Sequence, residues 1–293
     1  MSEKSSETII AGVRLSSPDK VLYPDQGITK QQLAEHYVTV ADLMLPHVAS
    51  RPLTMVRCPI GQEKKCFYQR HAGSGVPEQL HEVKVPGFDD PYLYVKDVQG
   101  LVAMVQMGVL EMHPWGVTVE RPDKPDRIIF DLDPDEGLDF ANVVRAALEV
   151  RERLKARGLI SFVKTTGGKG LHVVAPLDPG PDWREVKAFA KGLSNEMAED
   201  APERFLTRIS KAERSGRIFI DYLRNDATST AVGPYSTRSR PGAPVATPLE
   251  WEELDKKLDP ANFTVETLPS RLAALKRDPW AEMLKVRQSV PAL

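Results

Sequence analysis

Two aspartates one residue apart end an apolar segment near the middle of the chain. Asp131 and Asp133 follow the apolar run at 128–130 and precede Pro134. In a strand, residues i and i+2 point to the same face, so both carboxylates are expected to face one point beyond the sheet. Their mutual repulsion in a low-dielectric site would be relieved by a divalent cation, and oxygen ligands suit Mg²⁺ or Mn²⁺. The alternative is an exposed strand end with two solvated acids.

A third aspartate, Asp221, lies inside another apolar pattern at 218–223. An acid rarely occupies such a position unless something pairs with it. A salt bridge to Arg217 or Arg224 is the simplest explanation. As a third ligand, Asp221 would complete a two-metal centre, in which one ion activates a 3′-hydroxyl and the other binds the leaving pyrophosphate.

A glycine-rich turn at 167–170 joins two further expected strands. Its three glycines would let backbone N–H groups approach an anion closely. Thr166 and Lys169 add a hydroxyl and a cation suited to phosphate oxygens, and His172 lies on the following strand. The spacing does not fit the P-loop pattern, and an ordinary hairpin turn is the alternative.

Three arginines follow the third acid: Arg224, Arg238 and Arg240. Their planar guanidinium groups are suited to bidentate binding of a triphosphate, and a solvated loop on a basic surface is the alternative. His113 precedes the acidic strand. Taken by itself, it is better explained as a structural histidine with its hydrogen bonds satisfied.

The elements that must position these side chains alternate between strand and helix without the regular period of a barrel, which predicts a mixed α+β architecture. Thr29 is expected to cap a helix over 30–45 that Pro46 ends. Further helices are expected at 98–108, 140–157 and 183–198, and through most of about the last 45 residues. Strands are expected at 54–57, 66–69, 92–95, 111–120, 127–133, 162–165, 171–174 and 217–223. Residues 1–10 are predicted to be a disordered tail, and 11–293 one two-lobed domain.

The composition is that of an ordinary folded protein, with 293 residues of which 41% are hydrophobic. The net charge of −2 argues against a surface coated in basic charge. Basic residues nevertheless concentrate between 204 and 240, so a local basic groove is compatible with this balance. The longest apolar runs are far below the roughly 20 residues of a membrane helix.

The N-terminus is polar and lacks the apolar stretch of a signal peptide, which favours a cytoplasmic protein. Cys58 and Cys66 are the only cysteines, and their spacing matches no zinc or redox pair. Two reduced thiols are therefore expected.

Six segments, taken in order along nearly the whole chain, resemble the polymerase domain of bacterial ATP-dependent DNA ligase D, in the archaeo-eukaryotic primase superfamily. They are DKVLYP at 19–24, FYQRH at 67–71, EMHPWG at 111–116, FDLDP at 130–134, TGGKGLH at 166–172 and IDYLRN at 220–225. Each motif is weak by itself, and their number and order carry the resemblance. No ligase nucleophile motif is visible, so the chain is expected to be a stand-alone polymerase or a piece of a larger ligase.

The resemblance implies a primase-polymerase fold and a set of functional residues. Its catalytic metal ligands would be Asp131, Asp133 and Asp221, and its nucleotide contacts Thr166, Lys169, His172, Arg224, Arg238 and His113. Lys20 and Lys30 match the pocket that recognises a 5′-phosphate on the downstream side of a DNA gap. Phe67 and Tyr68 match aromatics that stack on the template strand, and Arg70 in the same motif is a further expected DNA contact.

The activity implied is template-dependent addition of nucleotides, preferably ribonucleotides, to a 3′-hydroxyl at gaps or ends during non-homologous end joining of double-strand breaks. It requires a nucleoside triphosphate and two divalent ions, Mn²⁺ or Mg²⁺. DNA is the expected partner, with Ku and a DNA ligase as further ones, and no membrane. Thr166 stands where family members often carry serine, and its extra methyl group weakens the expectation of ribonucleotide preference.

Two other functions remain open at this stage. Haloacid-dehalogenase-like phosphatases also have an apolar strand ending in Asp-x-Asp, with the first aspartate as nucleophile. Their motif normally continues with Gly-Thr near the N-terminus, whereas Pro134 and Asp135 follow here. The other alternative is a non-catalytic module that binds DNA ends, against which the retention of three acids argues.

Overall fold

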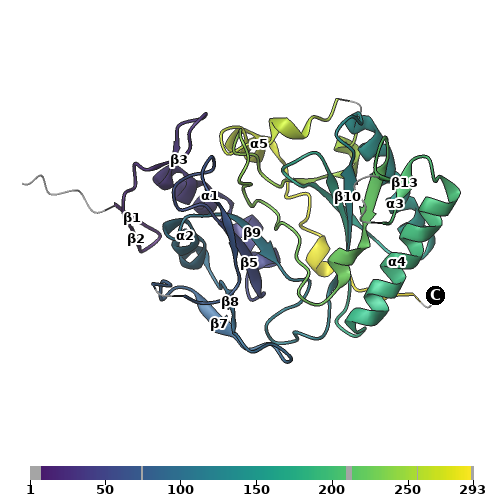
Figure 1. Cartoon of the computed structure of the whole chain (residues 1–293), viewed down its shortest axis with the longest axis horizontal. Coiled ribbons are helices and arrows are strands. Elements are labelled where there is room, and N and C mark those ends of the chain that lie inside the picture. The colour runs from purple at the N-terminus through teal and green to yellow at the C-terminus, as the bar shows by residue number, and fades with distance from the viewer. Residues whose placement is uncertain (1–7, 74, 209–212, 256, 292–293) are drawn as a thin grey trace, which may run out of the picture.

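The computed structural model describes residues 8–73, 75–208, 213–255 and 257–291. These residues form two lobes that lie side by side, with the chain ends on opposite sides (Figure 1). Each lobe has its own large buried core, so the apolar side chains of the sequence are divided between two packing centres.

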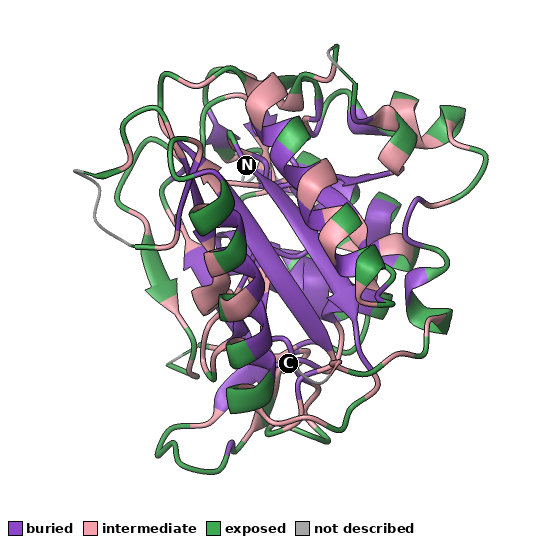
Figure 2. Cartoon of the chain, turned by 90° about the vertical axis from the view of Figure 1, so that its right-hand side faces the viewer, coloured by how far each residue is buried: buried purple, intermediate pink, exposed green. Residues whose placement is uncertain are grey.

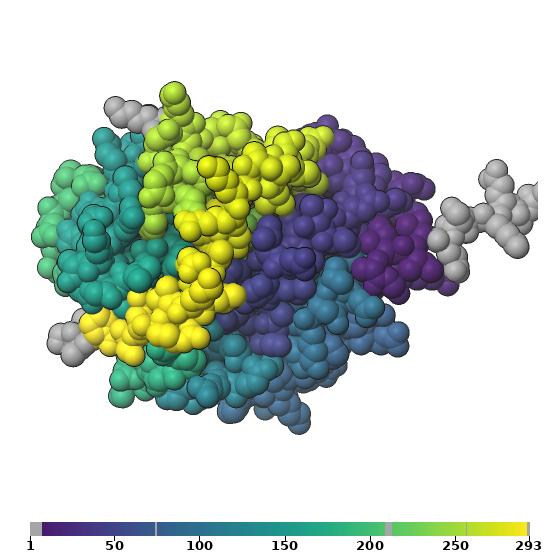
Figure 3. Space-filling model, turned by 180° about the vertical axis from the view of Figure 1, so that it is seen from behind, coloured from purple at the N-terminus to yellow at the C-terminus, as the bar shows by residue number. Residues whose placement is uncertain are grey.

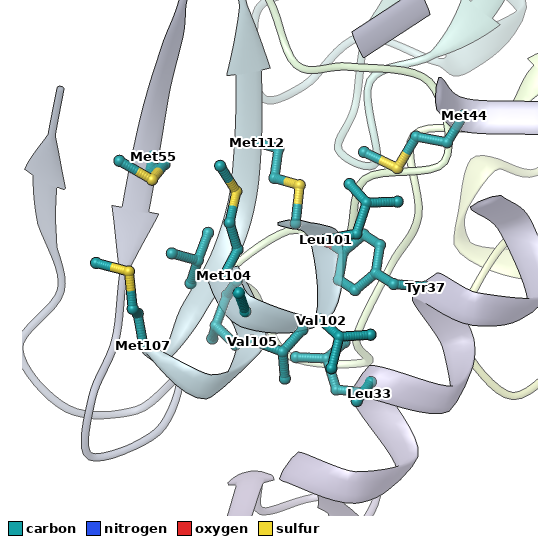
Figure 4. Packing of buried hydrophobic residues seen from close by; sticks show 14 of the residues in the cluster. Leu33, Tyr37, Met44, Met55, Leu101, Val102, Met104, Val105, Met107 and Met112 are labelled. Carbon is teal, nitrogen blue, oxygen red and sulfur yellow. The ribbon is translucent and has the colours of Figure 1, made fainter. Parts of the chain in front are cut away.

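The first lobe contains the N-terminal strands and two helices. Its strands are β1 (Thr8–Ile10), β2 (Val13–Leu15), β3 (Val21–Tyr23), β4 (Ile28–Thr29), β5 (Leu53–Arg57), β6 (Phe67–Gln69), β7 (His81–Val83), β8 (Tyr92–Tyr94) and β9 (Val109–Pro114). Its helices are α1 (Lys30–Val48) and α2 (Val98–Gln106). Strands β6, β5 and β9 form an antiparallel sheet in that order. Side chains of α1, α2, β5 and β9 meet in one apolar core, including Leu33, Leu101, Met55 and Met112 (Figure 4).

Helix α1 begins where the sequence predicts and ends later. Thr29 caps it and forms a capping box with Gln32. The prediction that Pro46 ends the helix is wrong, because Pro46 lies inside it. Proline removes one backbone hydrogen bond, but Met44 and Val48 on either side are fully buried and the Ala49 N–H still donates to the Leu45 carbonyl. Packing therefore outweighs the lost bond.

The second lobe is built on one sheet covered by two helices. Its strands are β10 (Arg127–Pro134), β11 (Phe162–Thr165), β12 (Leu171–Pro176), β13 (Phe205–Leu206), β14 (Ile218–Asp221) and β15 (Pro248–Leu249). They are ordered β13-β14-β10-β12-β11-β15, with every pair antiparallel except β13 and β14. Helices α3 (Phe140–Ala156) and α4 (Trp183–Asp200), capped by Asp139 and Asp182, lie over one face of the buried strands (Figure 2). A short 3₁₀ helix, η2 (Tyr222–Asn225), follows β14.

The C-terminal part differs most from expectation. The sequence predicts it to be mainly helical, but among its described residues the helical elements are α5 (Leu268–Ala274) and the short 3₁₀ helices η3 (Trp251–Glu253), η4 (Pro260–Asn262) and η5 (Met283–Lys285). The chain lies along the boundary between the lobes (yellow in Figure 3). Trp280 is buried there and donates to the Val163 carbonyl of β11. Both lobes cover the apolar residues of the C-terminal part. An extended chain can be buried in this way, so no helix is required.

The expected N-terminal tail is also shorter than predicted. Residues 1–7 lie outside the described residues, but Thr8–Ile10 form β1 and pair with β2, so a disordered tail over 1–10 is wrong for its last three residues. The partner strand follows directly after the turn at Ala11 and Gly12, so pairing is local.

The two cysteines are joined in a disulfide, which contradicts the expected reduced thiols. Cys58 follows β5 and Cys66 precedes β6, and the antiparallel register places Arg57 opposite Phe67. The pairing of the strands therefore brings the two cysteines together, which their spacing in the sequence does not disclose. Among the described helices none is both long and apolar enough to span a membrane.

Candidate active site

The three predicted aspartates meet at the centre of the second sheet. Asp131 on β10 lies directly opposite Asp221 on β14, and on its other side opposite His172 on β12. Asp133 is two residues further along β10 and therefore faces the same side. All four side chains line one cavity of about 320 Å³. The register of three neighbouring strands thus assembles residues that are up to 90 positions apart in the sequence.

Positive side chains bind all three carboxylates. Arg224 Nε lies 3.0 Å from Asp131 Oδ2 and 3.2 Å from Asp221 Oδ2. Asp221 therefore pairs with Arg224, as the simpler explanation proposed. Arg214 donates to Asp133 over 2.8 Å, and Lys169 Nζ lies 3.9 Å from the same carboxylate. Burial would raise the pKa of Asp131, but His172 and Arg224 hold that pKa well below its ordinary value. Burial raises the pKa of Asp221, with Arg224 opposing it.

His172 is almost fully buried beside Asp131. Its Nε2 lies 3.4 Å from Asp131 Oδ1. Burial, reinforced by the charge of Lys164, lowers the pKa of His172 to about 4, against the attraction of Asp131. The ring is therefore neutral at pH 7. It can donate or accept a hydrogen bond without adding a full positive charge to the cavity.

The glycine-rich turn joins β11 and β12 and lines the same cavity. A Cβ on Gly167, whose φ is +64°, would lie 2.6 Å from Arg238 Cγ, and one on Gly170 would lie 2.5 Å from the Leu132 carbonyl oxygen. Glycine is therefore required for the turn to approach β10 and Arg238. Thr166 Oγ1 is within hydrogen-bond distance of both the N–H and the carbonyl of Gly170. The turn is a hairpin connection and a wall of the cavity at once.

The first lobe contributes His113 from β9. Its Nε2 lies 2.8 Å from Glu111 Oε2, and Arg238 Nε donates to the same oxygen over 2.8 Å. Arg238 Nη1 also donates to the Thr166 carbonyl. His113 is thus paired within the fold, as expected of a structural histidine, and it also lines the cavity.

The structure brings every predicted catalytic and nucleotide-contacting residue to one cavity between the lobes. Its lining includes Tyr68, His113, Asp131, Asp133, Thr166, Lys169, His172, Arg214, Asp221, Arg224, Arg238 and Arg240. Sequence analysis did not single out Arg214 or Glu111. Arg214 is one of many basic residues in its region, so nothing distinguished it. Glu111 had a usable signal, since it is an acid within the apolar strand Val109–Pro114.

The residues predicted to contact DNA are divided between two places. Phe67 and Tyr68 are exposed on β6, and Tyr68 borders the cavity. Lys20 Nζ donates to the Pro59 carbonyl and Lys30 Nζ to the Ser16 carbonyl.

Burial, followed by the charge of Lys20, lowers the pKa of Lys30, and the Lys30 backbone N–H donates to the Lys20 carbonyl. Neither of these lysines lines the cavity. Arg70 is exposed and also lies outside the cavity lining.

The donors at the cavity fit hard divalent ions. Three carboxylates face it, and their oxygens are ligands of the type that Mg²⁺ and Mn²⁺ prefer. Within the described part of the chain, no three acidic, histidine or cysteine side chains are already grouped as a metal cluster. Arg224 and Arg214 bind the carboxylate oxygens instead.

Comparison with known proteins identifies the family. The family model for the LigD primase-polymerase domain matches residues 29–280. The multifunctional non-homologous end joining protein LigD of Pseudomonas aeruginosa is 38% identical over 292 residues, covering 98% of this chain and 35% of that protein. The bifunctional LigD of Bacillus subtilis is 28% identical over 272 residues, covering 92% of this chain and 44% of its own length. The chain spans less than half the length of these curated relatives, 35% of one and 44% of the other.

A solved structure supports the same assignment. The polymerase domain of Mycobacterium tuberculosis Ligase D, in complex with DNA, superimposes with a TM-score of 0.85 at 30% identity, covering 92% of this chain and 97% of that one. The predicted α+β primase-polymerase fold is confirmed, and the phosphatase alternative is set aside. The chain belongs to the LigD primase-polymerase domain family, and is accordingly a DNA-directed nucleotidyltransferase.

Proposed function

We propose that this chain extends a 3′-hydroxyl at DNA gaps or broken ends, copying a template strand, during non-homologous end joining. One observation carries the proposal: adjacent strands place Asp221, Asp131 and His172 side by side at a cavity that the glycine-rich turn also lines. Family membership supplies the type of reaction. The curated relatives are named for non-homologous end joining, which supports the repair context and a location with the DNA in the cytoplasm.

Asp131, Asp133 and Asp221 would hold two divalent ions, Mn²⁺ or Mg²⁺. When bound, these ions would lower the barrier by polarising the attacking hydroxyl and neutralising the leaving pyrophosphate. Lys169 and Arg238 would bind phosphate oxygens of the incoming nucleotide. Arg224 would exchange its carboxylate partners for phosphate.

The preference for ribonucleotides depends on the sugar contact. Thr166 is the predicted contact, and its hydroxyl is within hydrogen-bond distance of the Gly170 backbone at 3.2 and 3.3 Å. The Gly170 backbone then uses the proton and one lone pair of this hydroxyl, and the second lone pair can accept from a 2′-hydroxyl. We expect faster use of a ribonucleoside than of a deoxyribonucleoside triphosphate, measured as kcat/KM for each.

DNA would extend from the cavity across the first lobe. Tyr68 and Phe67 would stack on template bases, Arg70 would contact the backbone, and Lys20 and Lys30 would bind the 5′-phosphate beyond the gap. The Mycobacterium tuberculosis domain was solved with DNA, which supports DNA as the partner. Ku and a DNA ligase are the further partners proposed.

The test is primer extension on a gapped duplex bearing a 5′-phosphate, with Mn²⁺ and ribonucleoside triphosphates. Wild type should extend the primer, and the Asp131→Ala/Asp133→Ala variant should lose at least about a thousandfold in rate, because it removes two of the three carboxylates. Equal absence of product from both proteins would contradict the polymerase assignment. DNA binding without extension would favour the non-catalytic end-binding alternative.

A further inference from the structure

Glu111 is a buried acid whose oxygens are fully used. It lies on β9 with only 4% of its surface exposed. Its Oε2 is 2.8 Å from His113 Nε2 and 2.8 Å from Arg238 Nε. Its Oε1 accepts from the Ser239 N–H and from the Ser239 hydroxyl, at 2.8 and 2.6 Å. Burial opposes its ionisation, but His113 and Arg238 lower the pKa of Glu111 far below its ordinary value, so it is a carboxylate at neutral pH.

These contacts join parts of the chain that are distant in sequence. His113 is two residues from Glu111 and therefore faces the same side of β9. Arg238 and Ser239 belong to the segment at 231–247, which runs from the second lobe into the first core and back to β15. Arg238 also donates from Nη1 to the Thr166 carbonyl in the glycine-rich turn. Glu111 thus connects the first lobe to the wall of the cavity through Arg238.

The Glu111 carboxylate determines which hydrogen-bonding groups His113 and Arg238 direct into the cavity. An ionised carboxylate only accepts, so His113 must carry its proton on Nε2, and in the neutral ring Nδ1 is an acceptor. Arg238 uses Nε and Nη1 within the protein, and among the described residues its other N–H groups have no acceptor, so they can donate to an anion in the cavity. Fixing the guanidinium beforehand reduces the rotamer entropy lost when a ligand binds.

We infer that Glu111 is a positioning residue for nucleotide binding: it orients Arg238 toward the triphosphate and sets the tautomer of His113. This inference rests on the proposed function, because it concerns the same cavity. Glu111 itself does not line that cavity and does not contact the acids of the second lobe.

The test is the Glu111→Gln variant. Glutamine has nearly the same shape, but its NH₂ group cannot accept from Arg238 or Ser239, so one of the two sides loses its hydrogen bonds. We expect the KM for ATP and the dissociation constant of ATP in the presence of Mn²⁺ to rise about tenfold, with a smaller change in kcat. The dissociation constant is measured by calorimetry and is independent of turnover.

Asp126→Asn is the matched control. Asp126 is also an acid bound by arginines, Arg51 and Arg127, with 16% of its side chain exposed, but it lies outside the cavity lining. Asp126→Asn should lower the melting temperature and leave the affinity for ATP unchanged. A general loss of folding would affect both variants alike, whereas a positioning role affects ATP binding only in Glu111→Gln.

A double-mutant cycle with Arg238→Ala separates positioning from an independent contribution. If Glu111 acts through Arg238, Glu111→Gln should weaken ATP binding far less in the Arg238→Ala background than in wild type. Additive effects, or an unchanged ATP affinity in a folded Glu111→Gln protein, would overturn the inference. Should Glu111→Gln not fold, Ser239→Ala, which removes one hydrogen bond to Oε1, must show a smaller loss in the same direction.

The outcomes for the two proposals can be told apart. Wild type that binds ATP but extends no primer would contradict the proposed function, and the ATP affinities would still decide the inference. Wild type that extends primers, with Glu111→Gln showing the same ATP affinity and KM, would overturn the inference alone. Wild type that neither binds ATP nor extends primers would overturn both.

Discussion

Burial keeps several histidines of this protein uncharged. Burial lowers the pKa of His36 to about 4, that of His47 to about 3 and that of His172 to about 4. His36 lies on α1, and its Nε2 is 3.2 Å from the Tyr235 carbonyl oxygen. Each of these side chains binds a proton near pH 6.5 when the chain is unfolded, but not when it is folded. Their environment therefore makes stability depend on pH.

The sign of this dependence follows from proton linkage. Because the folded pKa of His36 is below its unfolded value, the unfolded state binds more protons between pH 6.5 and about 4, and stability falls as the pH is lowered through that window. Through His36 alone, the free energy of unfolding should fall by on the order of 3 kcal/mol as the pH is lowered through that window. His36→Gln, which can still donate to the Tyr235 carbonyl, should flatten the dependence between pH 6.5 and 4.

Urea unfolding at several pH values measures this. His81 on β7 is only partly buried, and its change to Gln is the control, which should leave the slope as in wild type. A His36→Gln protein with an unchanged slope would mean that His36 is already protonated in the folded state.

Among the elements, strand register has the largest effect on the active site. A shift of β10 by one residue relative to β12 and β14 would turn Asp131 and Asp133 to the opposite face, toward the helices. The buried residues Phe130 and Leu132 alternate with the two aspartates and face the core instead. The hydrophobic pattern of β10 therefore holds the two aspartates toward the cavity.

The connection between β5 and β6 is closed by the disulfide, and it supports residues expected to bind DNA. Phe67 directly follows Cys66, and the Pro59 carbonyl that accepts from Lys20 directly follows Cys58. Reduction of the disulfide would release this connection in the folded and unfolded chain. We therefore expect the free energy of unfolding to fall by about 2 kcal/mol. A thiol reductant should therefore lower the melting temperature of wild type.

The Cys66→Ser variant is the matched control, since its melting temperature should already be lowered and should not respond to the reductant. Alkylation of wild type without reductant should label neither cysteine. Labelling of both cysteines in the folded, untreated protein would contradict the disulfide.

At the scale of the whole molecule, the two lobes are tied together by residues that return across their boundary. The segment at 231–247 packs Tyr235 and Val245 into the first core before it joins the second sheet as β15. Arg51 of the first lobe forms a two-fold hydrogen bond with Asp126 at the entry to the second. Side chains from both lobes therefore line the same cavity.

Lys20 and Lys30 lie outside the cavity lining, so we expect them to bind a part of the DNA beyond the cavity. Lys20→Ala/Lys30→Ala should weaken binding to gaps carrying a 5′-phosphate by about tenfold or more, and binding to the same gaps without the phosphate by less. Competition binding at one fixed salt concentration measures both affinities. Lys64 is an exposed lysine in the β5–β6 connection, and Lys64→Ala should weaken binding to both substrates equally. If the double variant weakens binding to both substrates equally, these lysines are general contacts to the DNA backbone.

Much of this protein could be predicted from its sequence, because local patterns carry local information. Thr29 predicted the start of a helix, and the apolar runs predicted β10, β12 and β14 within one or two residues. The ordered motifs predicted the family and the residues that line the cavity. These features depend on residue type and short-range spacing, which the sequence displays directly.

Other features depended on contacts between distant segments and could be seen only in the tertiary structure. The pairing of Asp131 with Asp221, the disulfide and the extended C-terminal part all follow from which strands lie beside each other. Glu111 could be noticed as an acid in an apolar strand, but its partner Arg238 is 127 positions away and is identified only by the tertiary structure. Residue types and local spacing predicted most of the strands and helices and the polar side chains that meet at the cavity. Strand register and the packing of two lobes decided which charges meet, because electrostatic pairing depends on distance in space and not along the chain.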